Sequence, residues 1–150
     1  MLWRALLAFL ALPGVVAIAV PAWLAAGALR AGGRVYPVGL LPLFVGLVLL
    51  LWCVRDFYVA GKGTLAPWSP PRHLVTTGLY RYSRNPMYVA VAIMLAGWAL
   101  SFASPTLAIY AGFVMGAFHL RVVYGEEPWL ARTHGAEWTE YAARVPRWLV

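Results

Sequence analysis

Three long stretches of the chain contain no Asp, Glu, Lys or Arg. They cover residues 5–29, 35–54 and 85–120, which is 25, 20 and 36 residues. A helix needs roughly 20 apolar residues to cross a bilayer, so the first two stretches each predict one spanning helix. The third is long enough for two, and its interruption by Ser101, Ser104 and Pro105 predicts a tight turn between them. The sequence therefore predicts an all-α membrane protein with four spanning helices.

The composition agrees with this class, because 63% of the residues are hydrophobic and only 11% are charged, against about 25% charged in soluble domains. We expect one domain over residues 1–150, with spans near 5–28, 38–56, 87–102 and 105–123, a loop at 57–86 and a tail at 124–150. The first stretch is longer than the roughly 7–15 residues of a signal-peptide core, which favours a mature helix. The tail has an amphipathic pattern after Pro128, which predicts a helix that lies on the membrane or closes over a site.

The basic residues predict an orientation. Four spans would put ten of the twelve Lys and Arg on the side of the termini and the long loop, and only Arg30 and Arg34 opposite. The positive-inside rule then predicts an inner membrane protein with its termini and polar motifs in the cytoplasm. The net charge of +7 borders helices, where it meets lipid headgroups, so we expect no nucleic-acid partner. With Cys53 alone, we expect neither a disulfide nor a cysteine metal site, and the oligomeric state is left open.

Two polar clusters flank the hairpin of the third and fourth spans. The first precedes the third span, where Asn85 is a favourable N-cap and Pro86 a favourable first residue of a helix. A helix N-terminus with Arg81 and Arg84 beside it is also a candidate anion site for a carboxylate or a phosphate. Both interpretations are open at this point.

The second cluster contains Glu126 and Glu127, which follow the fourth span. A helix C-terminus disfavours negative charge, so the pair needs an explanation. Either Pro128 starts a new helix that the glutamates cap, or the carboxylates bind an ammonium or ribose hydroxyls, or accept a proton. Because the hairpin returns to the same membrane face, we expect the two clusters to meet.

Three further ionisable residues are candidates for the same site. His119 precedes the glutamates on the fourth span and can accept a proton near neutral pH, although a lone histidine is often only hydrogen-bonded. Arg144 and Arg147 lie near the end of the tail. They are expected to bind either lipid phosphate or the glutamates.

Six motifs follow one another in a specific order and spacing over about residues 61–148. They are Gly61-Lys62-Gly63-Thr64, Pro70-Pro71, Leu74-Val75-x-x-Gly78-x-Tyr80-Arg81-x-x-Arg84-Asn85-Pro86-Met87-Tyr88, Glu126-Glu127-Pro128-x-Leu130, Gly135-x-x-Trp138-x-x-Tyr141 and Val145-Pro146-Arg147-Trp148. In combination they resemble the membrane methyltransferases. This superfamily groups isoprenylcysteine carboxyl methyltransferases with phospholipid N-methyltransferases.

The resemblance implies S-adenosylmethionine as the cofactor, and we expect no metal. Together with the residue patterns above, it gives three sets of candidate site residues. The set for the cofactor is His73, Val75, Gly78, Tyr80, Arg84, Asn85, Pro86, Tyr88, Glu126 and Glu127. The set for the substrate is Arg81, Tyr141 and Arg147, and the set for catalysis is Glu127, His119 and Arg144. The chain departs from the family pattern at Tyr80, where a glycine is usual, and at Asn85, where a histidine is usual. Asparagine keeps hydrogen bonding but cannot transfer a proton there.

The resemblance also implies the reaction, which is methyl transfer to a membrane lipid that enters from the bilayer. We expect the acceptor to be the headgroup amine of a phospholipid such as phosphatidylethanolamine, which must lose a proton before attack. The alternative is the carboxylate of an isoprenylcysteine-like acceptor, or another isoprenoid or thiol acceptor. A non-enzymatic alternative is a small structural or transport protein, although no ionisable residue is expected at mid-membrane, where transport sites lie.

Overall fold

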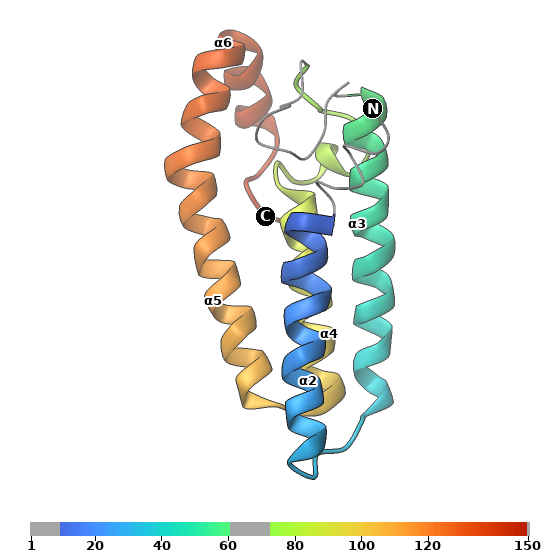
Figure 1. The fold of residues 1–150 in the computed structure, drawn as a ribbon. Coiled ribbons are helices and arrows are strands. Elements are labelled where there is room, and N and C mark those ends of the chain that lie inside the picture. Colours follow the sequence, from blue (N-terminus) through green and yellow to red (C-terminus); the bar gives the residue numbers. More distant parts are fainter. Residues whose placement is uncertain (1–9, 61–72, 150) are drawn as a thin grey trace.

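The computed structural model describes residues 10–60 and 73–149. Residues 5–9, the Gly61–Thr64 motif and the prolines up to Pro71 lie outside the described residues, as does Val150. The described elements are all helical (Figure 1). In chain order they are η1 (Leu10–Ala19), α2 (Val20–Arg30), η2 (Pro37–Gly39), α3 (Leu40–Ala60), η3 (Gly78–Arg81), α4 (Pro86–Phe102), α5 (Pro105–Arg121), η4 (Val122–Glu126) and α6 (Glu127–Arg144).

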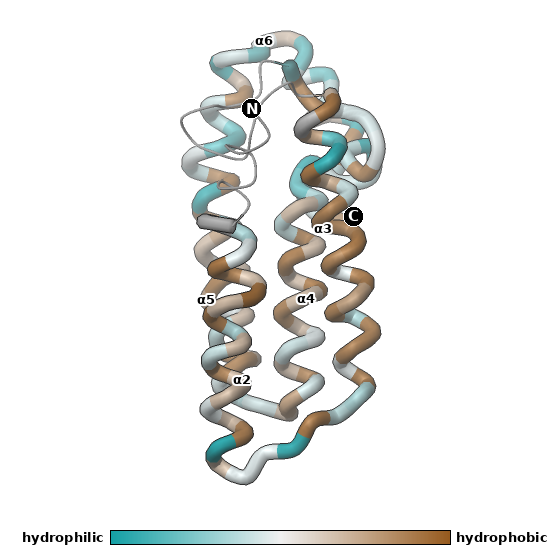
Figure 2. Tube along the Cα trace, turned by 45° about the vertical axis from the view of Figure 1, so that its right-hand side comes forward, coloured by the Kyte–Doolittle hydropathy of each residue, from teal (hydrophilic) through white to brown (hydrophobic). Residues whose placement is uncertain are grey.

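Four apolar helical segments run side by side. Three are long and apolar enough to cross a membrane, Pro13–Arg30, Pro37–Phe57 and Pro105–Arg144, and α4 is a shorter apolar helix. Figure 2 shows their hydrophobic residues between two more polar ends. The predicted all-α membrane class is therefore confirmed. The predicted start of the loop at residue 57 is wrong by four residues, because α3 continues to Ala60.

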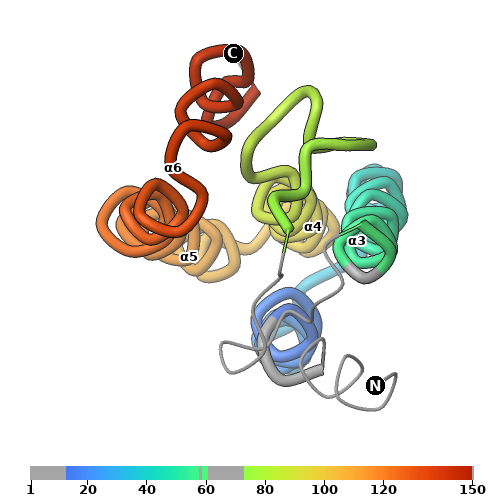
Figure 3. Tube along the Cα trace, turned by 90° about the horizontal axis from the view of Figure 1, so that it is seen from above, coloured from blue at the N-terminus to red at the C-terminus, as the bar shows by residue number. Residues whose placement is uncertain are grey.

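Helix α4 lies between α3, α2 and α5 when the bundle is seen from above (Figure 3). Its buried residues include Ala90, Val91, Met94 and Leu95, and these form the main apolar core. The backbones of α3 and α4 pack closely because small residues lie between them. A Cβ atom added to Gly97 would come within 2.6 Å of the backbone nitrogen of Leu43. Side chains larger than glycine are therefore excluded at this crossing.

The first span is tied to its neighbours by two side-chain hydrogen bonds. Pro21 has no N–H to offer the carbonyls four and five residues before it, Ala17 and Val16. The Trp98 indole N–H donates to the Ala17 carbonyl at 3.0 Å, and the Tyr110 hydroxyl donates to the Val16 carbonyl at 2.9 Å. Since an unsatisfied carbonyl in a bilayer costs several kcal/mol, these bonds fix η1 against α4 and α5.

The third and fourth spans are joined by a two-residue turn, as predicted. Ala103 adopts a left-handed conformation with φ 45°, and the Ser104 hydroxyl accepts the backbone N–H of Leu107 at 3.4 Å. The other end of α5 differs from the prediction. The helix continues through the π-helical turn η4 into α6, so the tail does not begin as a separate helix after residue 123.

The chain reverses at Gly135, within α6. This residue has φ 52° and ψ −119°, a conformation that needs glycine. The second half of α6 then packs back toward the bundle, where Trp138 and Tyr141 are buried. The Tyr141 hydroxyl donates to the backbone carbonyl of Tyr80 at 2.7 Å. This half of α6 therefore covers the segment that precedes α4.

Candidate functional site

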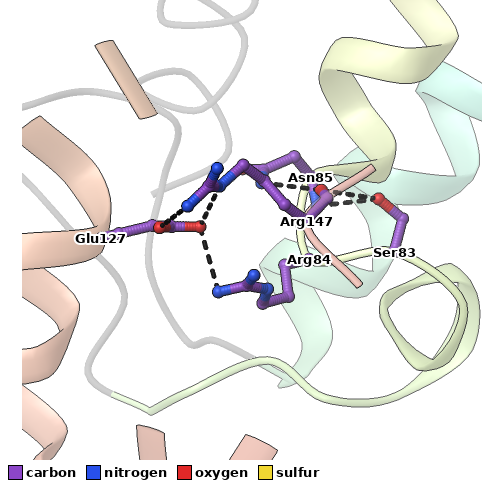
Figure 4. Close-up of polar contacts among 5 residues, drawn as sticks. All are labelled: Ser83, Arg84, Asn85, Glu127 and Arg147. Atoms are coloured by element: carbon purple, nitrogen blue, oxygen red, sulfur yellow. Dashed lines mark hydrogen bonds and ion pairs between the residues drawn. The ribbon is translucent and has the colours of Figure 1, made fainter. Parts of the chain in front are cut away.

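The two polar clusters meet at one end of the bundle, as expected. Glu127 Oε1 lies 3.0 Å from Arg84 Nη1, and Glu127 Oε2 lies 2.8 Å from Arg147 Nη2 (Figure 4). Arg147 Nε donates to Oε1 at 2.9 Å, which makes this pair bidentate. The hydrogen bond to Glu127 raises the pKa of Arg147 above its usual value. One carboxylate thus joins the start of α6, the segment before α4 and the end of the chain.

The segment before α4 also binds the chain end through its backbone. Asn85 Nδ2 donates to the Arg147 carbonyl at 3.0 Å, and the Ser83 hydroxyl donates to the same carbonyl at 3.3 Å. The Arg84 backbone N–H donates to the Pro146 carbonyl at 2.9 Å. Asn85 is the N-cap residue of α4, as predicted, but its side chain makes no cap hydrogen bond. Pro86 does occupy the first turn of α4, as predicted.

Glu126 belongs to a separate group of polar residues. Its Oε1 accepts the Tyr88 hydroxyl at 2.5 Å and Arg121 Nε at 2.7 Å. The Tyr88 ring packs on Phe118, with 4.4 Å between ring centroids. The π-helical turn η4 lies between Arg121 and Glu126 along the chain. π-helical turns are rare and occur frequently at functional sites.

A cavity of about 750 Å³ lies beside both groups. This volume falls within the range of small-molecule sites, roughly 300–1,000 Å³. Its lining comes from η1, α3, η3, α4, α5, η4, α6 and the segment after residue 72. The lining residues are Pro13, Val16, Phe57, His73, Leu74, Val75, Tyr80, Arg84, Asn85, Met87, Tyr88, Val91, Phe118, Arg121, Gly125, Glu126, Trp129, Leu130, Arg132, His134, Trp138 and Tyr141.

The cavity changes character along the bundle. Toward the spanning region it is lined by apolar residues such as Val16, Val91 and Phe118, and toward α6 by charged and aromatic residues. Two buried nitrogens of lining residues, Arg84 Nε and His134 Nε2, have no hydrogen-bond partner among the described residues. Burial raises the pKa of the Tyr80 hydroxyl, which therefore stays neutral. Such a site fits a ligand with both polar groups and an apolar neighbour.

Eight of the predicted site residues line this cavity. They are His73, Val75, Tyr80, Arg84, Asn85, Tyr88, Glu126 and Tyr141. The others lie outside it. Glu127 and Arg147 pair with each other behind Arg84, and Pro86 begins α4. Arg81 is exposed at the end of η3.

The three remaining candidates also have other neighbours. Gly78 has φ 60°, and a Cβ atom there would collide with the buried carboxylate of Asp56. The His119 ring stacks with that of Trp148 at 6.1 Å, and Arg144 lies 3.4 Å from Glu140. Their predicted roles stay predictions, and the structure gives each a local partner.

Several lining residues were not predicted from the sequence, among them Arg121, Trp129, Arg132 and His134. Arg121 lies five residues before Glu126, a spacing that a regular α-helix does not bring together and the π-helical turn does. Trp138 was part of a recognised motif but was not assigned to the site. Its ring lies 5.5 Å below the Arg84 guanidinium, a cation–π contact.

Known proteins resemble the chain over most of its length. A family model for phospholipid methyltransferases matches residues 35–137. A nickel-cobalt-cadmium resistance protein of Alcaligenes xylosoxydans xylosoxydans is 30% identical over 73% of this chain and 46% of its own length. A protein-S-isoprenylcysteine O-methyltransferase B of Arabidopsis thaliana is 34% identical over 49% of this chain and 37% of its own length.

The chain thus spans less than half the length of these two curated relatives. No solved structure shows a significant match. Among residues 10–60 and 73–149, no group of three His, Cys, Asp or Glu is placed to hold a metal ion. The family model covers more than two thirds of the chain, including both polar clusters and the first half of α6. The chain belongs to the phospholipid methyltransferase family.

Proposed function

We propose that the protein transfers a methyl group from S-adenosylmethionine to a membrane lipid, and that the acceptor is the headgroup amine of a phospholipid such as phosphatidylethanolamine. The cavity carries this proposal, because it joins a charged half to an apolar half at the end of the spanning helices. The cofactor has a carboxylate, an ammonium and ribose hydroxyls, and supplies a methyl group bound to a sulfonium. The charged half contains residues for each polar group.

Arg84, Asn85 and the aromatic ring of Trp138 are the residues that would hold the cofactor. The unpartnered Nε of Arg84 is a donor for a carboxylate, and the Trp138 ring, which lines the cavity, supports the Arg84 guanidinium through a cation–π contact. Glu127 acts through Arg84, since its ion pair fixes the guanidinium beside the cavity. Positioning of this kind supplies much of the rate in a methyl displacement.

An amine acceptor must give up its proton before it attacks. Glu126 is the carboxylate that lines the cavity, whereas Glu127 is shared by two arginines and His119 lies outside the lining. The contacts of Glu126 use Oε1, so Oε2 is available among the described residues for a proton or an ammonium. We therefore assign to Glu126 the role of the base that accepts the proton of the amine acceptor.

Carboxyl methylation is the second candidate, supported by the Arabidopsis relative whose name gives isoprenylcysteine as its acceptor. A carboxylate is already ionised at neutral pH, so it needs orientation and no base. Substitution of Glu126 by Gln separates the two reactions. It should abolish methylation of an amine, which loses its base, and only weaken methylation of a carboxylate, because glutamine Oε1 can still accept the N–H of Arg121 Nε.

Calorimetric titration of the purified protein with S-adenosylhomocysteine tests the proposal first. We expect binding to wild type and to Glu140→Gln, and at least about tenfold weaker binding to Glu127→Gln because Arg84 loses its fixed position. Glu140 is a matched control, since its side chain is 73% exposed and neither it nor its partner Arg144 lines the cavity. Transfer of labelled methyl from the cofactor to phosphatidylethanolamine or to a prenylated cysteine then identifies the acceptor. A folded wild type that binds no cofactor product would overturn the proposal and favour the non-enzymatic alternative.

A further inference from the structure

Arg121 lies where the two halves of the cavity meet. On its own helix Phe118 lies one turn earlier and Gly125 one turn later, and all three line the cavity. Before Arg121 the lining from α5 and η1 is apolar, and after it the lining is charged. An amphiphile with its chains toward the spanning region would therefore place its polar group beside Arg121.

Glu126 holds the Arg121 guanidinium in place, and the guanidinium still has N–H donors available for a ligand. Its Nε donates to Glu126 at 2.7 Å, and Glu126 is itself held by the Tyr88 hydroxyl. The side chain is 52% exposed, and apart from Glu126 its guanidinium has only the Tyr88 hydroxyl as a neighbouring hydrogen-bonding group among the described residues. A guanidinium offers five N–H donors, and its terminal edge binds carboxylates and phosphates in a bidentate manner.

The other arginines of this region differ from Arg121. Arg84 and Arg147 share Glu127, and Arg144 pairs with Glu140 on the outside of α6. Arg132 lines the cavity as well, but it lies in the first half of α6, more than two turns beyond Arg121 along the helix. Arg121 thus differs from these arginines, because it follows the apolar lining residue Phe118 by one turn on the same helix and makes its ion pair through Nε.

The charges around the cavity favour an anion. The lining contains the cations of Arg84, Arg121 and Arg132 and the anion of Glu126. Glu127 compensates the charge of Arg84, but it also pairs with the cation of Arg147. Positive charge therefore remains in excess around the cavity. A sulfonium cofactor would add to this excess. An acceptor with a negative group next to its reacting group would lower this excess of positive charge.

We propose that Arg121 binds the anionic group of the lipid acceptor, so that the enzyme recognises amphiphiles that carry a phosphodiester or a carboxylate at the membrane surface. The inference rests on the proposed function and deepens it, because it states what the acceptor must contain. A phospholipid presents its phosphodiester beside the amine, and a prenylated cysteine presents the carboxylate that is methylated. Glu126 positions Arg121 in both cases.

Binding of short-chain amphiphiles tests the assignment independently of turnover. The probes are dihexanoyl phosphatidylethanolamine with dihexanoylglycerol as its uncharged match, and N-acetyl-S-farnesylcysteine with its methyl ester. Each is titrated into detergent-purified protein with and without S-adenosylhomocysteine. The variants are Arg121→Gln, Arg121→Lys and, as control, Arg55→Gln, which removes an exposed arginine paired with a carboxylate outside the cavity.

We expect wild type to bind at least one charged probe about tenfold more tightly than its uncharged match. Arg121→Gln should remove this preference, Arg121→Lys should retain part of it, and Arg55→Gln should behave as wild type. The affinity for S-adenosylhomocysteine should change less than about twofold in all variants, because none of them removes a proposed contact with the cofactor. Loss of one charge-assisted hydrogen bond to the cofactor would instead weaken its binding about tenfold. The better charged probe identifies the source of the anion.

Three results would overturn the assignment. They are an unchanged preference in Arg121→Gln, no preference in wild type, and an equal loss of S-adenosylhomocysteine affinity, which would move Arg121 to the cofactor. Failure of the proposed function has a different signature. In that case wild type binds no S-adenosylhomocysteine, while the amphiphile titrations without it still report on Arg121.

Discussion

At the scale of single residues, the carboxylate of Glu127 holds two arginines that lie 63 positions apart in the chain, Arg84 and Arg147. The Glu127 and Arg84 side chains are only 15% and 14% exposed, so neither is well solvated when its partner is lost. We expect Glu127→Gln to lower the free energy of unfolding by about 2 kcal/mol. Glu140→Gln removes an exposed pair and should cost less than about 0.5 kcal/mol. Denaturant titration in detergent measures both, and equal effects would contradict a structural role for Glu127.

Tyr141 makes the stability of the protein depend on pH at high pH. Its buried hydroxyl donates to the Tyr80 carbonyl, and burial raises its pKa from 10.0 to about 12. Because the unfolded tyrosine ionises first, the stability contributed by Tyr141 is complete below pH 10 and is lost as the pH rises to about 12. Tyr141→Phe should reduce the slope of stability against pH in this window. It should also cost about 1–2 kcal/mol at neutral pH, because the Tyr80 carbonyl loses its donor. An unchanged slope measured by unfolding between pH 9 and pH 12 would count against this.

At the scale of elements, the docking of the first span depends on Pro21. Its missing N–H leaves the carbonyl of Val16 to the Tyr110 hydroxyl. We expect Tyr110→Phe to cost about 1–2 kcal/mol in the wild-type background. In Pro21→Ala a backbone N–H becomes available near the same carbonyls, so the cost of Tyr110→Phe should fall by at least half. A double-mutant cycle of unfolding free energies in detergent measures the difference, and additive costs would show that the two residues are not coupled.

The helix hairpin shows what the sequence could and could not predict at this scale. The span boundaries at Phe102 and Pro105 followed from a serine and a proline between apolar runs. The junction at Gly125 and Pro128 also contains residues that weaken a helix, yet the helix continues there through a π-helical turn. Local propensity does not distinguish the two cases, because the second depends on tertiary contacts of Glu126 and Glu127. Arg121 was missed for the same reason.

At the scale of the whole molecule, the resemblance that the motifs indicate is confirmed at the level of the family. The two polar clusters could be predicted to meet, because two spanning helices lie between them in the chain and return it to the same face of the membrane. The cavity itself could not be predicted from the sequence. Its lining combines η1 with α4, which begins about 70 residues later in the chain, and with α6, which begins more than 100 residues later. The pairwise packing that forms it is set by Gly97 against α3 and by the hydrogen bonds of Trp98 and Tyr110, which no local pattern reveals.

The orientation of the bundle decides which compartment supplies the methyl donor. S-adenosylmethionine is charged and soluble, so the proposed function requires the end with α6 to face the cytoplasm, as the positive-inside rule predicts. Thr133→Cys and Val35→Cys place exposed thiols at opposite ends of the bundle, and native Cys53 is fully buried. A membrane-impermeant maleimide should label Val35→Cys in intact cells, Thr133→Cys only after permeabilisation, and wild type in neither case. The reverse pattern would place the cavity on the side without cofactor, and the methyltransferase activity would then have no donor.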